Sequence, residues 1–164
     1  MSRRHRYAVN VEWTGNLGEG TAGYRSYSRA TKVSGESKAT ISGSADPEFR
    51  GDPSAWNPEE LLVAALSQCH LLSYLHVCAA NDVVVTAYTD SAEGTMAQTE
   101  GGAQFTEVML HPHVRVASKS MVERAERLHV QANAACFIAR SVNFPVLHQA
   151  TIHLATSAGG LDPP

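Results

Sequence analysis

The order of the predicted elements indicates an α+β fold with antiparallel strand pairing. Alternating apolar residues predict strands near the start of the chain, and a long apolar stretch predicts a helix over 58–80. A hairpin, a second helix and a last strand follow, so helices and strands occupy separate segments of the chain. We therefore predict a single α+β domain that covers residues 1–164.

The N-terminal part, residues 7–44, is predicted to contain three short strands. Every second residue of the first strand is large and apolar: Tyr7, Val9, Val11 and Trp13. This alternation predicts a half-buried strand over 7–14. The glycine-rich sequence at 15–20 predicts a turn, so 21–30 is expected to return as an antiparallel strand, and 38–44 is expected to form the third.

A loop and a long helix are predicted next. The segment 45–56 is rich in proline, glycine and aspartate, which predicts a loop. The helix is predicted over 58–80, because Pro58 suits a first helical position and Glu59 and Glu60 place negative charge at the helix N-terminus. Apolar residues surround most of its circumference, so we expect this helix to be buried.

The second half of the chain is predicted to form a hairpin, a helix and a strand. Two long strands within 83–117 are expected to meet at a turn that contains Gly101. A helix is predicted over 118–141, with a capping signal in which Glu123 follows a serine by three residues. The last strand is predicted at 146–155.

Composition and charge narrow the function classes. A chain with 43% hydrophobic and 18% charged residues is typical of a folded protein. Its net charge of −3 gives no reason to expect a nucleic-acid surface. The basic start has no apolar signal region after it, and the three cysteines form no CxxC pair. We therefore expect a cytoplasmic protein with no cofactor, no metal and no nucleic-acid or membrane partner.

Helix geometry distinguishes the three cysteines. Cys69 and Cys78 are nine residues apart, which places them on opposite faces of one helix, about 13 Å apart along its axis, and prevents a disulfide. Cys78 is therefore expected to fill space in the core. Cys136 lies on the apolar side of the second predicted helix, and two buried helices could bring it close to Cys69. Spacing alone leaves open whether this pair is functional or structural.

A reactive Cys69 would need a nearby positive charge, because burial in an apolar helix disfavours a thiolate. On the helix itself, His70 and His76 are the nearest candidates. A histidine carries a positive charge only when it is protonated, whereas an arginine is charged at any working pH.

Two arginines are better candidates for this charge. Strand alternation over 21–30 would place Arg25 and Arg29 on one face. Glu59 could then hold one guanidinium through two hydrogen bonds. Taken alone, however, the residues favour solvated arginines and an ordinary helix-start charge at Glu59.

Two cysteine motifs occur in a characteristic order. The sequence Asn-Pro-Glu-Glu-Leu-Leu spans 57–62, and Cys69 follows Glu59 by ten positions. The sequence Ala-Ala-Cys-Phe-Ile-Ala-Arg-Ser-Val-Asn spans 134–143. Together with the glycine-rich segment 13–21, these motifs resemble the OsmC/Ohr family of thiol-dependent peroxidases. The resemblance covers nearly the whole chain.

The resemblance implies a function for these residues. Cys69 would correspond to the peroxidatic cysteine, which attacks the O–O bond of a hydroperoxide and becomes a sulfenic acid. Cys136 would correspond to the resolving cysteine, which then forms a disulfide with it. Glu59 would correspond to the carboxylate that positions the catalytic arginine, for which we prefer Arg29 over Arg25.

The resemblance also implies substrates and architecture. The family reduces organic hydroperoxides with electrons from small dithiols or lipoylated proteins. Its fold is an intertwined homodimer with antiparallel sheets around two buried central helices. The alternative is a divergent OsmC-like stress-associated or ligand-binding protein without peroxidase turnover.

Two features of this chain bear on that comparison. Cys136 is followed by Phe137, where many family members have proline. On one unbroken helix, Glu59 and Cys69 would lie about 15 Å apart, too far for one arginine to contact both readily. Either the helix breaks between them, or a second subunit supplies one of the groups.

Overall fold

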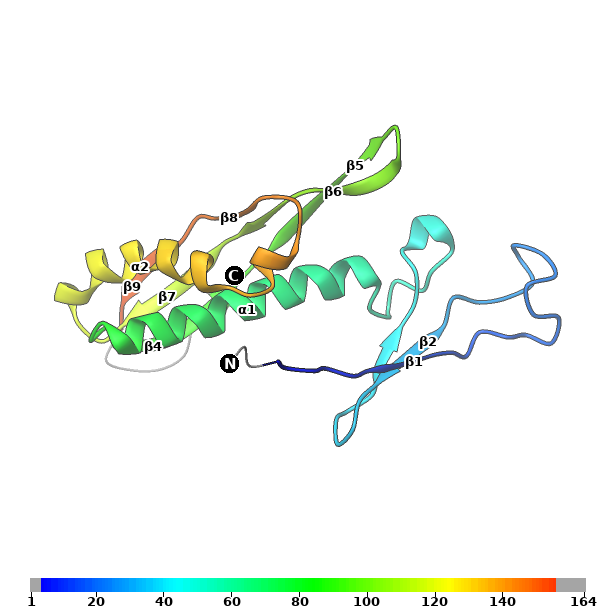
Figure 1. Cartoon of the computed structure of the whole chain (residues 1–164), viewed down its shortest axis with the longest axis horizontal. Coiled ribbons are helices and arrows are strands. Elements are labelled where there is room, and N and C mark those ends of the chain that lie inside the picture. The colour runs from blue at the N-terminus through cyan, green and yellow to red at the C-terminus, as the bar shows by residue number, and fades with distance from the viewer. Residues whose placement is uncertain (1–3, 156–164) are drawn as a thin grey trace. The chain divides into compact units, whose positions relative to one another are not determined.

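The computed structural model describes residues 4–155. Contacts between residues divide the chain into two compact units, which we call unit 1 (Met1–Leu61) and unit 2 (Leu62–Pro164). Figure 1 traces both units from the N-terminus to the C-terminus.

Unit 1 is built on a three-stranded antiparallel sheet in the order β1-β2-β3. Its elements are β1 (Asn10–Trp13), β2 (Thr31–Ser34), β3 (Ile41–Gly43) and a short 3₁₀ helix, η1 (Pro47–Phe49). The first and third strands therefore lie within the predicted ranges, and the loop contains one helical turn.

The predicted return strand at 21–30 is wrong. This segment consists mainly of turns and bends, and the strand that pairs with β1 begins at Thr31. The side chain of Asn16 accepts the backbone N–H groups of Gly18 and Gly20, and both glycines have positive φ. These local contacts lengthen the turn beyond the glycine-rich sequence and delay the return of the chain.

Unit 1 has almost no buried apolar side chains of its own. All four residues of β1 are exposed, so the predicted half-buried strand is not half-buried in this chain. The large apolar residues of the unit that are exposed are Tyr7, Val9, Val11, Trp13, Leu17, Tyr24, Ile41, Phe49 and Trp56. Among the described residues, neither hydrophobic cluster includes a member of unit 1.

Helix α1 (Pro58–Ala80) has the bounds that the sequence predicts. Asn57 and Glu60 form a reciprocal capping box, in which each side chain accepts the backbone N–H of the other residue. In this chain only one stripe of the helix is buried, at a spacing of four: Leu66, His70, Tyr74 and Cys78. The expected burial on all sides is therefore not found in the single chain.

The apolar composition of α1 has a second consequence. Among residues 4–155, it is the one helix that is long and apolar enough to cross a membrane by length and composition alone. The core helix of a globular protein passes the same test.

The remaining strands form two three-stranded sheets in unit 2, in the orders β4-β7-β9 and β5-β6-β8. The strands are β4 (Val85–Asp90), β5 (Glu93–Thr99), β6 (Gly102–Leu110), β7 (Pro112–Val116), β8 (Val146–His148) and β9 (Thr151–Leu154). The turn at Gly101 is where the sequence places it. Each predicted long strand, however, is divided into two.

The break between β6 and β7 has two chemical causes. After β6 the carboxylate of Asp90 accepts the N–H of His111 at 2.7 Å, and Pro112 has no N–H to offer a neighbouring strand. β4 pairs with β7 and β5 with β6 in antiparallel fashion, as predicted. The last two strands pair in parallel with β6 and β7, so the sheets are mixed and not purely antiparallel.

The second helix is shorter than predicted. Helix α2 covers Val122–Ala135 and is flanked by the 3₁₀ helices η2 (Lys119–Met121) and η3 (Ala139–Ser141). The predicted capping signal is wrong, because the hydroxyl of Ser120 is hydrogen-bonded to that of Ser118 and no side chain caps α2. Cys136 lies just beyond the helix in an extended conformation.

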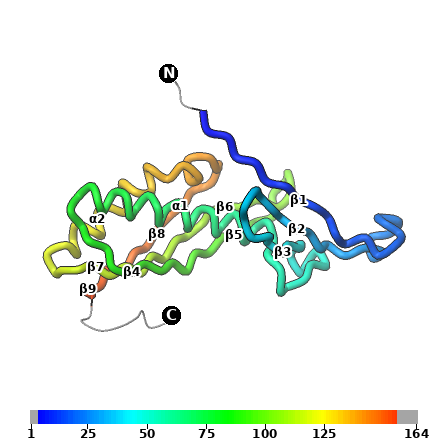
Figure 2. Tube along the Cα trace, turned by 90° about the horizontal axis from the view of Figure 1, so that it is seen from below, coloured from blue at the N-terminus to red at the C-terminus, as the bar shows by residue number. Residues whose placement is uncertain are grey.

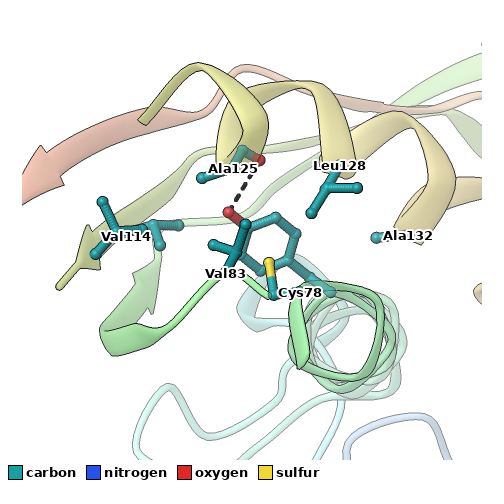
Figure 3. Packing of buried hydrophobic residues seen from close by; sticks show 8 residues of the cluster. Cys78, Val83, Val114, Ala125, Leu128 and Ala132 are labelled. Atoms are coloured by element: carbon teal, nitrogen blue, oxygen red, sulfur yellow. Dashed lines mark hydrogen bonds between the residues drawn. The ribbon is translucent and has the colours of Figure 1, made fainter. Parts of the chain in front are cut away.

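The core of unit 2 lies between the two helices and the sheets, and helices α1 and α2 run alongside the strands (Figure 2). The larger cluster contains Tyr74, Cys78, Val83, Val114, Val116, Ala125, Leu128 and Ala132. A smaller one contains Leu66, Val108, Leu110 and Val146. Figure 3 shows the larger cluster, in which the Tyr74 hydroxyl donates a hydrogen bond to the Ala125 carbonyl at 3.0 Å.

Candidate active site

Helix α1 and the segment after α2 bring two thiols together in unit 2. Cys69 precedes His70 of the buried stripe by one residue, so it lies at the edge of that stripe and is half-buried. Cys136 is buried, with 1% of its surface exposed. The two side chains lie close enough to interact, and both thiols are free.

The surroundings of Cys136 make its thiol a weak acid. Burial is the main cause that raises the pKa of Cys136 to about 11, and the neighbouring Cys69 acts in the same direction. The Cys136 sulfur accepts the N–H of Ala139 at 3.4 Å. This contact fixes the thiol at the point where the chain leaves α2 and enters η3.

Cys78 belongs to the core, as its helix phase predicts. It is 1% exposed and packs in the larger cluster beside Tyr74. Burial raises the pKa of its thiol, which keeps it protonated and unreactive at neutral pH.

A group of buried histidines lies beside the same helices. Nε2 of His70 on α1 and Nδ1 of His129 on α2 are 3.0 Å apart, and the two rings are stacked. His148 on β8 faces both rings, and Tyr74 stacks on His129 with centroids 3.8 Å apart. Burial lowers the pKa of His70 to about 4 and that of His129 to about 3, so both are neutral near pH 7. His70, one of the candidates for a positive charge near Cys69, therefore does not supply it at neutral pH.

Arg29 occupies an unusual position in unit 1. Its guanidinium carbon lies 4.3 Å from the ring centroids of both Tyr24 and Tyr27. Nη1 donates to the backbone carbonyls of the same two tyrosines, at 3.0 and 2.9 Å. Nη2 is buried and has no hydrogen-bond partner among the described residues.

The second arginine candidate lies in a different setting. Arg25 is exposed, whereas Arg29 is half-buried. The expectation that both share one strand face is wrong, because 21–30 is not a strand.

Glu59 lies in the first turn of α1. Its Oε2 atom is buried and lacks a hydrogen-bond partner within residues 4–155. Helix α1 is unbroken from Pro58 to Ala80, so Glu59 and Cys69 are separated by about 15 Å along one helix axis. A break in the helix, which could have let one arginine contact both Glu59 and Cys69, is therefore not present.

Sequence reasoning missed the histidine group and the contacts of Tyr24 and Tyr27 with Arg29. A signal for His70 was present, because it occupies the same four-residue spacing as Leu66 and Tyr74. The contact with His129 could not be found from spacing, since 59 residues separate the two. Within the described residues, no group of three or more histidine, cysteine or acidic side chains is arranged to hold a metal ion.

Comparison with known proteins places the chain in a family. The model of the OsmC-like protein family matches residues 51–149. The structure of an OsmC-like protein of unknown function from Vibrio cholerae is 31% identical in sequence, and the match covers 90% of this chain and 100% of that one with a TM-score of 0.82. Among curated proteins, none matches this chain.

More distant structures share the fold. An organic hydroperoxide resistance protein from Elizabethkingia anophelis is 19% identical over 93% of this chain and 100% of its own, with a TM-score of 0.66. The organic hydroperoxide resistance protein OsmC from Legionella pneumophila is 15% identical over 92% and 98%, with a TM-score of 0.63. The mixed α+β fold, the matched segment and the Vibrio relative together show that this chain belongs to the OsmC-like family.

Proposed function

We propose that this protein is a thiol-dependent peroxidase that reduces organic hydroperoxides. The observation that carries the proposal is the neighbouring pair of free thiols, Cys69 and Cys136, one half-buried and one buried. A half-buried thiol can meet a substrate, and a buried thiol in contact with it can form a disulfide without large movement. The names of the Elizabethkingia and Legionella relatives support the same substrate class.

The chemistry uses the two thiols in sequence. The thiolate of Cys69 attacks the terminal oxygen of a hydroperoxide, so an S–O bond forms, the O–O bond breaks, and the alkoxide leaves as an alcohol after taking a proton. Cys136 then attacks the sulfur of the sulfenic acid, and water leaves with the proton of the Cys136 thiol. A dithiol or lipoylated protein reduces the resulting disulfide by thiol–disulfide exchange.

Arg29 and Glu59 complete the proposed site. A guanidinium stabilises the thiolate and the developing alkoxide, because it stays charged at every working pH. Nη2 of Arg29 and Oε2 of Glu59 are both buried atoms that have no hydrogen-bond partner in the described part of the chain. Each therefore calls for a partner of opposite charge.

The site is proposed to form in a homodimer, with one subunit supplying Arg29 and Glu59 and the other supplying Cys69 and Cys136. The unbroken helix α1 supports this division, because it separates Glu59 from Cys69 of the same chain. The large exposed apolar residues of unit 1 support it as well, since a surface of this kind is typical of an obligate interface. The occupant of that interface is a second copy of this chain.

Three free cysteines suit a reducing cytoplasm, where we propose that the protein acts. The thiols of Cys69 and Cys136 lie in contact without being joined, as a catalytic pair in its reduced state requires.

The test is mass spectrometry after addition of one equivalent of cumene hydroperoxide. We expect a Cys69–Cys136 disulfide in the native protein and a trapped sulfenic acid at Cys69 in the Cys136→Ser variant. Cys69→Ser should show neither product and should lose peroxide-dependent dithiol oxidation. Cys78→Ser is the matched control, a buried thiol on the same helix, and should keep the disulfide.

The alternative, an OsmC-like protein without turnover, has one observation in its favour. Phe137, which follows Cys136 directly in the sequence, is 76% exposed, and an exposed phenyl ring suits a binding surface. If neither disulfide nor sulfenic acid forms with cumene hydroperoxide, the peroxidase proposal fails and this alternative takes its place.

A further inference from the structure

The segment before β2 folds around the side chain of a single arginine. Arg29 stacks on the rings of Tyr24 and Tyr27, and its Nη1 donates to the backbone carbonyls of both. We call these three residues the arginine cage. A flexible arginine loses much of its rotamer freedom when its plane and one of its nitrogens are fixed in this way.

Tyr27 is itself held in place by the end of β1. The ring of Trp13 contacts the ring of Tyr27 edge-on, with centroids 5.8 Å apart and planes at 87°. The Trp13 indole N–H donates to the Ser28 carbonyl at 2.9 Å, and Ser28 donates its N–H to the carbonyl of Gly15. A side chain at Gly15 would place its Cβ 2.0 Å from the Ser28 oxygen, so only glycine allows this approach.

The cage leaves one part of the guanidinium available. Nη1 is saturated by two carbonyls, and the ring faces cover the plane of the group. Nη2 is buried, and the described residues offer it no acceptor. A buried cationic N–H without a partner is costly, so this edge is suited to a ligand that carries negative charge.

We propose that Tyr24 and Tyr27 are positioning residues, which hold Arg29 so that its Nη2 edge binds the oxyanion at the reacting centre. This inference rests on the proposed function. The aromatic faces also attract the cation, because the π-system of each ring carries negative charge on its face. Arg29 is thus oriented before the substrate arrives, which reduces the cost of ordering it in the transition state.

The first experiment separates the aromatic ring from the hydroxyl. Tyr24→Leu and Tyr27→Leu should each lower kcat/KM for cumene hydroperoxide by about tenfold, the rate equivalent of part of one cation–π contact. Tyr24→Phe and Tyr27→Phe keep the ring and should keep most of the activity. Thermal unfolding of each variant, followed by circular dichroism, checks that the fold is retained.

The second experiment is chemical rescue. Arg29→Gly should lose activity, and millimolar guanidinium ion should restore part of it by entering between the two rings. The double variant Arg29→Gly/Tyr27→Leu should show no such rescue. A merely structural tyrosine would not change the response to added guanidinium.

The outcomes separate the cage from the proposed function. If Arg29→Gly loses activity but the leucine variants do not, or if rescue is equal with and without Tyr27, the cage inference is overturned and the peroxidase proposal stands. If Arg29→Gly keeps full activity, the role proposed for Arg29 is wrong. NMR tests the cage without any turnover: the side-chain proton signals of Arg29 should show ring-current shifts that the phenylalanine variants keep and the leucine variants lose.

Discussion

Units 1 and 2 are stabilised in different ways. Unit 2 encloses both hydrophobic clusters and the two thiols, so its part of the site is fixed by packing within one chain. Unit 1 leaves its large apolar residues exposed and orders Arg29 through local stacking and hydrogen bonds. In the proposed dimer, one subunit would supply both thiols, whereas the exposed apolar residues of unit 1 would need the second copy for their burial.

The strongest test of this comparison is complementation between two inactive variants. Arg29→Ala and Cys69→Ser homodimers should both be inactive. After the two are unfolded and refolded together, half of the dimers are mixed, and each mixed dimer has one site with native Arg29 and Cys69 from different chains. We therefore expect about a quarter of native activity in a peroxidase assay with dithiothreitol.

The control for complementation is a mixture of Cys69→Ser and Cys136→Ser. Both changes lie in unit 2, so a mixed dimer has no site with both thiols, and turnover through the disulfide should not return. If the Arg29→Ala and Cys69→Ser mixture also stays inactive while mixed dimers are present, both groups come from the same chain and the proposed division between the units is incorrect.

The same comparison shows what the sequence could and could not predict. Helix α1 was predicted to its end residues, because proline, acidic and apolar signals act locally. The division of the long strands was not, since it depends on Asp90 meeting His111 from 21 residues away. The parallel pairing of β8 with β6 and of β9 with β7 likewise joins segments far apart in the sequence, so a local pattern does not predict it.

The site shows the same limit. Helix phase was enough to set Cys78 apart from Cys69, and the structure places Cys78 in the core. The arginine cage was hidden, although the spacing of Tyr24, Tyr27 and Arg29 is visible in the sequence, because a strand was expected where glycine turns fold the chain back. The missing information is the backbone conformation at those turns.

Substitution of an apolar residue in each unit should change the free energy of unfolding by different amounts. Leu66→Ala removes a fully buried side chain from the smaller cluster of unit 2 and should lower the free energy of unfolding by about 3 kcal/mol. Val11→Ala removes an exposed side chain of unit 1, so its effect within one chain should be below about 0.5 kcal/mol. Urea denaturation measures both changes.

Repeating both urea denaturations at several protein concentrations is the control for the Leu66→Ala and Val11→Ala variants. The loss caused by Leu66→Ala should be the same at every concentration, because it arises inside one subunit. Val11→Ala should act mainly on association, so sedimentation should show a weaker dimer and the urea midpoint should fall most in dilute samples. A concentration-independent loss for Val11→Ala would mean that unit 1 is stabilised within its own chain.

A pH dependence of stability is also expected, and its source is in unit 2. His70 and His129 are neutral in the folded protein, because burial lowers their pKa values from 6.5 to about 4 and about 3. In the unfolded chain both take up protons below pH 6.5, so the unfolded state binds more protons in this range. Stability is therefore complete above about pH 6.5 and falls toward pH 4, by roughly 1.4 kcal/mol per pH unit for each histidine.

The variant His129→Phe separates this effect from general acid denaturation. It keeps an aromatic ring against Tyr74 but removes one titrating group. The slope of the unfolding free energy against pH between 6.5 and 4 should therefore decrease by the contribution of one histidine. Urea unfolding at a series of pH values gives that slope. An unchanged slope for His129→Phe would mean that this buried pair does not control the acid stability of unit 2.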